Sequence, residues 1–114
     1  MKIVAVIGSR NLSVRDLELY IPDEADEIVS GGARGIDSCA RVYAKAHGIK
    51  LTEFLPEYGK YGKSAPLKRN IQIINYADEV VAIWDGVSRG TKFVIDKCRE
   101  MGVPVKVYMQ NDGK

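Results

Sequence analysis

Five short apolar runs recur at nearly regular intervals along this chain, and they constrain its fold more than any other feature. The first run is continuous rather than alternating, which is typical of a parallel strand that is buried on both faces. Helix-like segments separate the runs, and this alternation predicts an α/β fold with a parallel sheet. The expected strands cover residues 3–7, 27–30, 50–55, 79–84 and 103–108.

The segments between the runs carry apolar residues at helical spacing. We expect helices from Ser13 to Ile21, Ile36 to His47, Ser64 to Ile74 and Thr91 to Met101. In the first of them, Ser13 would cap the helix and Asp16 would complete part of a capping box. The order of strands and helices predicts a Rossmann-like, doubly wound, five-stranded parallel sheet in three α/β/α layers. Strand order 3-2-1-4-5 is favoured over 2-1-3-4-5.

Length and composition indicate one folded domain that covers residues 1–114. Hydrophobic residues make up 46 % of the chain, close to the globular average of about 45–50 %, so intrinsic disorder is excluded. A net charge of +2 is too small to indicate nucleic-acid binding by itself. The apolar runs are too short to span a membrane and no signal peptide is recognisable, so we expect a cytoplasmic protein. Residues 110–114 are expected to fray.

Small and polar residues follow three of the expected strands, and each of these loops leads into an expected helix. In doubly wound sheets, ligands bind outside the carboxyl ends of the strands, where the strand order reverses. Helix N-termini favour anions, glycine lets the backbone approach closely, and arginine binds phosphate in a bidentate manner. The loops therefore predict a phosphate or nucleotide site. Its expected residues are Gly8, Ser9 and Arg10 after the first strand, Ser30, Gly31, Gly32, Arg34, Gly35 and Asp37 after the second, Asp85, Gly86, Ser88, Gly90 and Thr91 after the fourth, and Arg69 and Asn70 on the third helix.

The loops lack the standard signatures of cofactor sites. Residues 30–37 do not have the G-x-G-x-x-G spacing of a dinucleotide fingerprint, and no Gly-Lys-Ser/Thr P-loop occurs. His47 is the only histidine, and Cys39 and Cys98 fit no metal or disulfide pattern. We therefore expect no cofactor and no metal.

A basic stretch with interleaved tyrosines precedes the third expected helix. Two interpretations stay open for it. It is either a solvated loop, or a surface that contacts phosphates or single-stranded nucleic acid. Its residues are Tyr58, Lys60, Tyr61, Lys63, Lys68 and Arg69.

The motifs at residues 30–37, 69–70, 77–81 and 85–91 resemble those of the SLOG superfamily. Their order and spacing are similar to the Rossmann-like core of the DNA-processing protein A (DprA/Smf) family. The short length and the Gly8-Ser9-Arg10 motif are closer still to the stand-alone YspA/YpsA-like SLOG proteins. The resemblance covers about residues 2–108, and its most specific part is the run from Ala33 to Asp37.

This resemblance implies a nucleotide or nucleotide-derived ligand in the glycine-rich loops, and a homodimer. In the cytokinin-activating branch of the superfamily, a Gly-Thr-x-x-Glu motif supplies a catalytic carboxylate for cleavage of an N-glycosidic bond. Here the motif begins with Gly90-Thr91, but Val94 stands at the position of the glutamate. Asp37 and Asp85 are therefore the remaining candidate carboxylates. Asp37 is equally suited to cap its helix.

Three functions therefore stay open. The first is a sensor or binding module for a nucleotide-type small molecule, which the three loops favour. The second is an N-glycosidase or phosphoribohydrolase. The third is a single-stranded DNA-binding module similar to the DNA-processing family, with weak binding through Lys60, Lys63, Lys68 and Arg69.

Overall fold

The apolar runs form the strands of one sheet in the computed structural model, which describes residues 1–110. All strand pairs are parallel, and the order is β3-β2-β1-β4-β5, as predicted. We expected residues 110–114 to fray, and of these, residues 111–114 lie outside the described part of the chain. The strands are β1 (Ile3–Gly8), β2 (Glu27–Ser30), β3 (Lys50–Glu53), β4 (Glu79–Trp84) and β5 (Val105–Met109).

The two central strands explain why the apolar runs are continuous. Residues 4–6 of β1 and 80–83 of β4 are completely buried, because layers of helices and loops cover both faces of the sheet. The edge strands are different. Lys50 of β3 and Lys106 of β5 are exposed, and neither edge strand has a fully buried residue. The core therefore sits around β1, β2 and β4.

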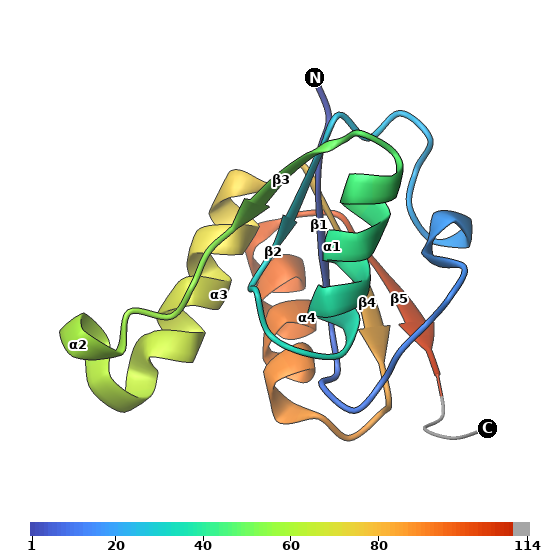
Figure 1. The fold of residues 1–114 in the computed structure, drawn as a ribbon. Coiled ribbons are helices and arrows are strands. Elements are labelled where there is room, and N and C mark those ends of the chain that lie inside the picture. Colours follow the sequence, from blue (N-terminus) through green and yellow to red (C-terminus); the bar gives the residue numbers. More distant parts are fainter. Residues whose placement is uncertain (111–114) are drawn as a thin grey trace.

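Helices cover the two faces of the sheet as the predicted three-layer α/β fold requires (Figure 1). Helix α1 (Ile36–Ala46) and the chain between β1 and β2 pack on one face. Helices α3 (Ala65–Tyr76) and α4 (Arg89–Met101) pack on the other. Gly102 ends α4 in a left-handed conformation with φ +76°, which is the usual glycine C-cap.

The helix expected from Ser13 to Ile21 is wrong. This segment contains only a 3-10 turn, Leu17–Leu19, and no side-chain cap. Asp16 has a non-helical backbone with φ −112° and ψ 51°, and Pro22 disfavours helical geometry at the residue before it. Leu17 and Ile21 are nevertheless buried against the same face as α1, so the apolar pattern reports burial without a helix.

A small arm projects from the sheet between β3 and α3 (Figure 1). It consists of the short helix α2 (Tyr58–Tyr61) and a 3-10 turn, Gly62–Ser64. This arm carries Lys60 and Lys63 of the basic stretch, whereas Lys68 and Arg69 lie on α3. None of the residues in α2 is buried, so the arm contributes little to the core.

Carboxylates at the amino ends of the strands are paired within the protein. Asp26 and Asp78 accept hydrogen bonds from the backbone N–H groups of Lys2 and Ile3, at 2.7 and 2.8 Å. Glu27 is buried and accepts hydrogen bonds from the hydroxyls of Thr52 and Tyr76, both at 2.7 Å. Burial acts to raise the pKa of Glu27, but these bonds and nearby Lys50 lower it below its ordinary value.

No helix within residues 1–110 is long and apolar enough to cross a membrane.

Replacement of Gly8 by Ala tests the close packing at the end of β1. An added Cβ would collide with the carbonyl oxygen of Ile83 and lie 2.6 Å from the Ile36 side chain. We expect Gly8→Ala to lower the free energy of unfolding by about 1–3 kcal/mol, the usual range for overpacking, as measured by urea denaturation. Gly59→Ala, where no atom lies within 4 Å of the added carbon, is the matched control. Equal stability of the two variants would contradict this packing.

Candidate functional site

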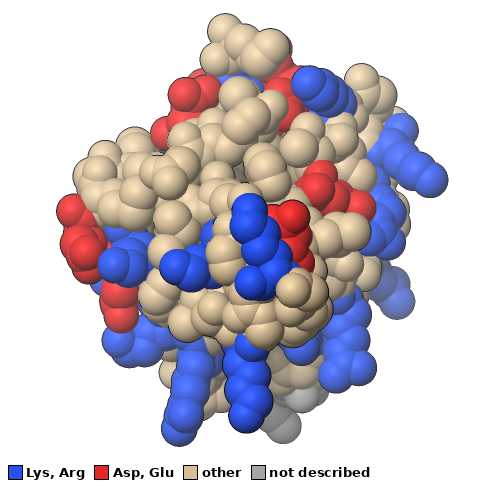
Figure 2. Space-filling view, turned by 90° about the vertical axis from the view of Figure 1, so that its left-hand side faces the viewer, with Lys and Arg blue, Asp and Glu red and all other residues tan. Residues whose placement is uncertain are grey.

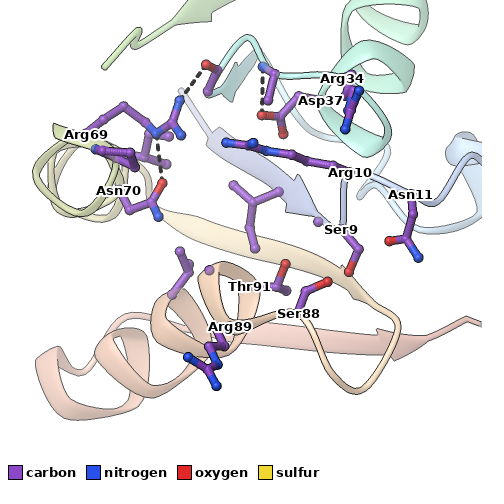
Figure 3. Close-up of a pocket in the computed structure, with 18 residues that line it drawn as sticks. Ser9, Arg10, Asn11, Arg34, Asp37, Arg69, Asn70, Ser88, Arg89 and Thr91 are labelled. Atoms are coloured by element: carbon purple, nitrogen blue, oxygen red, sulfur yellow. Dashed lines mark hydrogen bonds between the residues drawn. The ribbon is translucent and has the colours of Figure 1, made fainter. Parts of the chain in front are cut away.

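A cavity of about 720 Å³ opens at the carboxyl ends of the strands. Strands β2 and β3 lie on one side of β1, and β4 lies on the other side. The cavity lies at this point, where the strand order reverses. Figure 3 shows the lining side chains gathered from β1, α1, α3 and the start of α4. The predicted residues that line it are Gly8, Ser9, Arg10, Gly31, Arg34, Asp37, Arg69, Asn70, Ser88, Gly90 and Thr91.

Five predicted residues do not line the cavity: Ser30, Gly32, Gly35, Asp85 and Gly86. They shape the loops instead. Gly35 has φ +75°, and a Cβ there would lie 2.5 Å from the backbone oxygen of Arg10. This glycine therefore lets the start of α1 approach the loop after β1.

Arg69 is a buried strut rather than an exposed cation. Its side chain donates one hydrogen bond to the carbonyl oxygen of Gly31 at 2.6 Å and another to Oδ1 of Asn70 at 2.9 Å. A Cβ on Gly31 would lie 2.5 Å from the Arg69 guanidinium, so this glycine is needed for packing. Burial lowers the pKa of Arg69. The negative charge of Asp37 acts to raise this pKa, and the positive charge of Arg10 lowers it further. Arg69 thereby ties α3 to the loop after β2.

Among the described residues, 1–110, Asp37 is the only acidic one that lines the cavity. Its side chain is buried, with 7 % of the residue exposed. Oδ2 accepts a hydrogen bond from the backbone N–H of Ala33, before the helix, at 3.1 Å, so Asp37 braces the preceding loop and does not cap α1, whose N-cap is Gly35 with no side-chain cap. Oδ1 is buried and has no hydrogen-bond partner within the described chain. Burial raises the pKa of Asp37, against the bond from Ala33 and the positive charge of Arg69.

Asp85 holds the loop between β4 and α4 in shape. Its Oδ1 accepts hydrogen bonds from the backbone N–H groups of Val87 and Ser88, at 2.9 and 2.8 Å. Its Oδ2 accepts a bond from the Ser88 hydroxyl, and its own N–H donates to the Ser9 hydroxyl. Burial acts to raise the pKa of Asp85, but these bonds hold it at about 2. Trp84 belongs to the same loop, because its indole N–H donates to the carbonyl oxygen of Ser88 at 3.0 Å.

Three further arginines give the cavity its charge. Arg10, Arg34 and Arg89 line it and are exposed. None of them forms a hydrogen bond or ion pair with the chain from residue 1 to 110. Figure 3 shows Arg10 extending over the end of β1 toward Arg69. In Figure 2, the lowest part of the view, on the carboxyl side of the sheet, shows Lys and Arg but no Asp or Glu.

The sequence analysis missed some residues of the cavity. Arg89 stands between two predicted residues, Ser88 and Gly90, and its place in that loop was a usable signal. The apolar lining residues Ile7, Ile73 and Val94 carried no such signal, because each also fits the core pattern of its own strand or helix. The remaining additions are Asn11, Ala33 and Pro66.

The structure separates Arg69 from the other basic residues grouped with it. Lys60, Lys63 and Lys68 are exposed on the arm or at the start of α3, whereas Arg69 is buried at the cavity. Arg69 therefore cannot belong to a surface that binds a nucleic-acid strand together with these lysines. Within residues 1–110, no group of three or more His, Cys, Asp or Glu side chains is placed to hold a metal ion.

Comparisons with protein-family models, curated proteins and solved structures find no match to this chain. What stands is the Rossmann-like fold of a five-stranded parallel sheet, together with the cavity at its carboxyl edge.

The raised pKa of Asp37 predicts a specific pH dependence of stability. A carboxyl group whose pKa is higher in the folded state costs stability once it ionises, so the cost appears as the pH rises above its ordinary pKa of 3.8. Asp37→Asn removes the ionisation. The stability of this variant relative to the unmodified protein should therefore increase between pH 3.5 and neutral pH, as measured by urea unfolding at each pH.

Asp23→Asn is the control for this measurement, because Asp23 is exposed and does not line the cavity. Its relative stability should stay flat over the same range. A flat profile for Asp37→Asn as well would contradict the burial of an ionised carboxylate in the cavity.

Proposed function

We propose that this protein binds a nucleotide, or a nucleotide-derived anion, in the cavity at the carboxyl edge of its sheet. The observation that carries the proposal is the set of three arginines, Arg10, Arg34 and Arg89, that surround the cavity without partners in the described chain. Exposed arginines alone are common on protein surfaces. Here all three line one cavity at the switch point of a doubly wound sheet, where such folds bind ligands.

The backbone adds to the positive field of these side chains. Helices α1 and α4 both begin beside the cavity, but the start of α1 carries the Asp37 carboxylate, so an anion fits the start of α4, with Ser88, Gly90 and Thr91. N–H groups at helix N-termini and the helix dipole both favour a bound anion. Arginine adds bidentate hydrogen bonds that match the geometry of phosphate.

Size and lining favour a ligand larger than a simple anion. The volume of about 720 Å³ falls in the range of roughly 300–1,000 Å³ that is usual for small-molecule sites. Ile7, Ile73 and Val94 provide an apolar wall beside the charged groups. A phosphate ester with a sugar or base would use both parts of the cavity, whereas inorganic phosphate would use one.

The resemblance to the SLOG superfamily supports the same proposal. The motifs at 8–10, 30–37 and 85–91 cover the loops after β1, β2 and β4, and Arg69-Asn70 lies on α3, so that each of these contributes residues to the cavity; residues 77–81 lie at the start of β4 and do not line it. On this basis we place the chain with stand-alone SLOG proteins of the YspA/YpsA-like kind, acting as a sensor or binding module. Homodimer formation remains a prediction.

An N-glycosidase is the second candidate, and one observation bears on it. Val94, which stands where the Gly-Thr-x-x-Glu motif has its glutamate, is buried and lines the cavity. A hydrolytic reaction in this cavity would have to use Asp37 instead, and Asp85 is fully engaged in holding its own loop. Ligand binding without cleavage therefore agrees better with the site. Release of free base from nucleoside monophosphates would favour the enzyme.

Binding of single-stranded DNA remains a prediction for the arm. Lys60 and Lys68 lie 5.2 and 5.8 Å from the ring centre of Tyr61, and these side chains are accessible. A steep loss of oligonucleotide affinity with salt is expected if they bind phosphates.

Thermal-shift and calorimetric titrations with nucleoside mono-, di- and triphosphates test the proposed function. Arg34→Ala and Arg10→Ala should each weaken the best nucleotide by about 1.5–3 kcal/mol, the usual scale for hydrogen bonds to charged groups. Arg99→Ala, an exposed arginine in the last turn of α4 that does not line the cavity, should leave affinity unchanged. Failure of every nucleotide to bind, or full affinity in both cavity variants, would refute this proposal.

A further inference from the structure

Inside the cavity, one buried polar atom has nothing to bond with in the described chain. It is Oδ1 of Asp37. Buried polar groups are nearly always hydrogen-bonded, because leaving one unpaired costs about 1–3 kcal/mol. The partner of this oxygen is therefore expected to come from outside the chain, and Figure 3 shows the Asp37 carboxylate facing the space between α1 and α3.

The chemistry of Oδ1 determines which group of a ligand can form a hydrogen bond with it. An ionised carboxylate accepts hydrogen bonds and donates none. A phosphate oxygen would repel it, so the anionic part of a ligand cannot sit here. Arg69 remains positively charged nearby, but its Nη1 and Nε donate to Gly31 and Asn70 and not to this oxygen. The ligand must present a hydrogen-bond donor to Asp37.

The anionic part of the same ligand then belongs on the other side of β1. The start of α4 contributes Ser88, Gly90 and Thr91 to the lining there, with no carboxylate. Strands β2 and β4 flank β1, so the loops that follow them are about 10 Å apart at the backbone, two strand spacings.

We propose that Asp37 accepts a hydrogen bond from a ribose hydroxyl of the bound nucleotide, which makes the site selective for ribonucleotides over analogues that lack the 2′ and 3′ hydroxyls. This inference rests on the proposed function and adds an orientation to it. The phosphate lies toward α4, and the sugar hydroxyls lie toward α1. The cost of burying Asp37 in the empty protein is offset when the hydroxyl binds.

Calorimetric titration with the four ribonucleoside 5′-monophosphates and their 2′,3′-dideoxy counterparts tests this orientation. The best ribonucleotide should bind the unmodified protein about tenfold or more tightly than its dideoxy form, because the bond involves a charged acceptor. In Asp37→Asn the preference should fall below about threefold, through weaker binding of the ribonucleotide. Asp23→Asn, which lies outside the cavity, should keep the full preference.

The outcomes separate the two proposals. If none of the eight nucleotides binds, the proposed function fails and this inference fails with it. If nucleotides bind but the ribo and dideoxy forms bind equally, or if the preference survives in Asp37→Asn, only the assignment of Asp37 is overturned. A preference that follows the amino group of the base instead of the hydroxyls also overturns it. Should Asp37→Asn fail to fold, Asp37→Ser provides the same comparison.

Discussion

The pairing of β1 with β4 is the contact on which the rest of this structure depends. It joins the two halves of the chain in register, from Val4 opposite Glu79 to Gly8 opposite Ile83. Because the strands are parallel, their carboxyl ends meet at one edge of the sheet, and the loops that follow them become neighbours. The hydrogen bond from the Asp85 N–H to the Ser9 hydroxyl, at 3.2 Å, fastens these loops to each other. The cavity opens where the connections after β1 and β4 lead to opposite faces of the sheet.

The charged side chains at the two ends of the sheet differ in whether they have partners within the protein. At the amino ends, the carboxylates are paired within the protein: Asp26 and Asp78 bond to the backbone of β1, and Glu79 pairs with Lys2 at 2.9 Å and with Lys106 at 3.6 Å, although its buried Oε2 has no hydrogen bond. These contacts add to stability and leave little to bind a ligand. At the carboxyl ends, the lining arginines other than Arg69 have no partner in the described chain, and Asp37 keeps one buried oxygen unpaired. Such unmet polar groups cost stability and are typical of binding sites.

The sequence was sufficient for the strands, their order, three helices and most of the residues around the cavity, because buried parallel strands and glycine-rich loops leave strong local signals. It was misleading between Ser13 and Ile21, where apolar spacing suits a helix but Pro22 and the backbone at Asp16 limit it to a 3-10 turn. It also did not distinguish Arg69 from Arg34. One is a buried strut and the other an exposed cation, a difference set by tertiary contacts with Gly31 that no local pattern encodes.

The central claim is that the carboxyl edge of the sheet is where this protein meets its ligand. The most direct measurement is a titration of the isotope-labelled protein with nucleoside 5′-monophosphates, followed by backbone amide chemical shifts in NMR spectra. The account predicts that the largest changes fall in residues 9–11, 33–37 and 88–91, with little change at the amino ends of the strands. Changes confined to the arm at residues 58–64, or spread over the amino edge around Asp26 and Asp78, would contradict it.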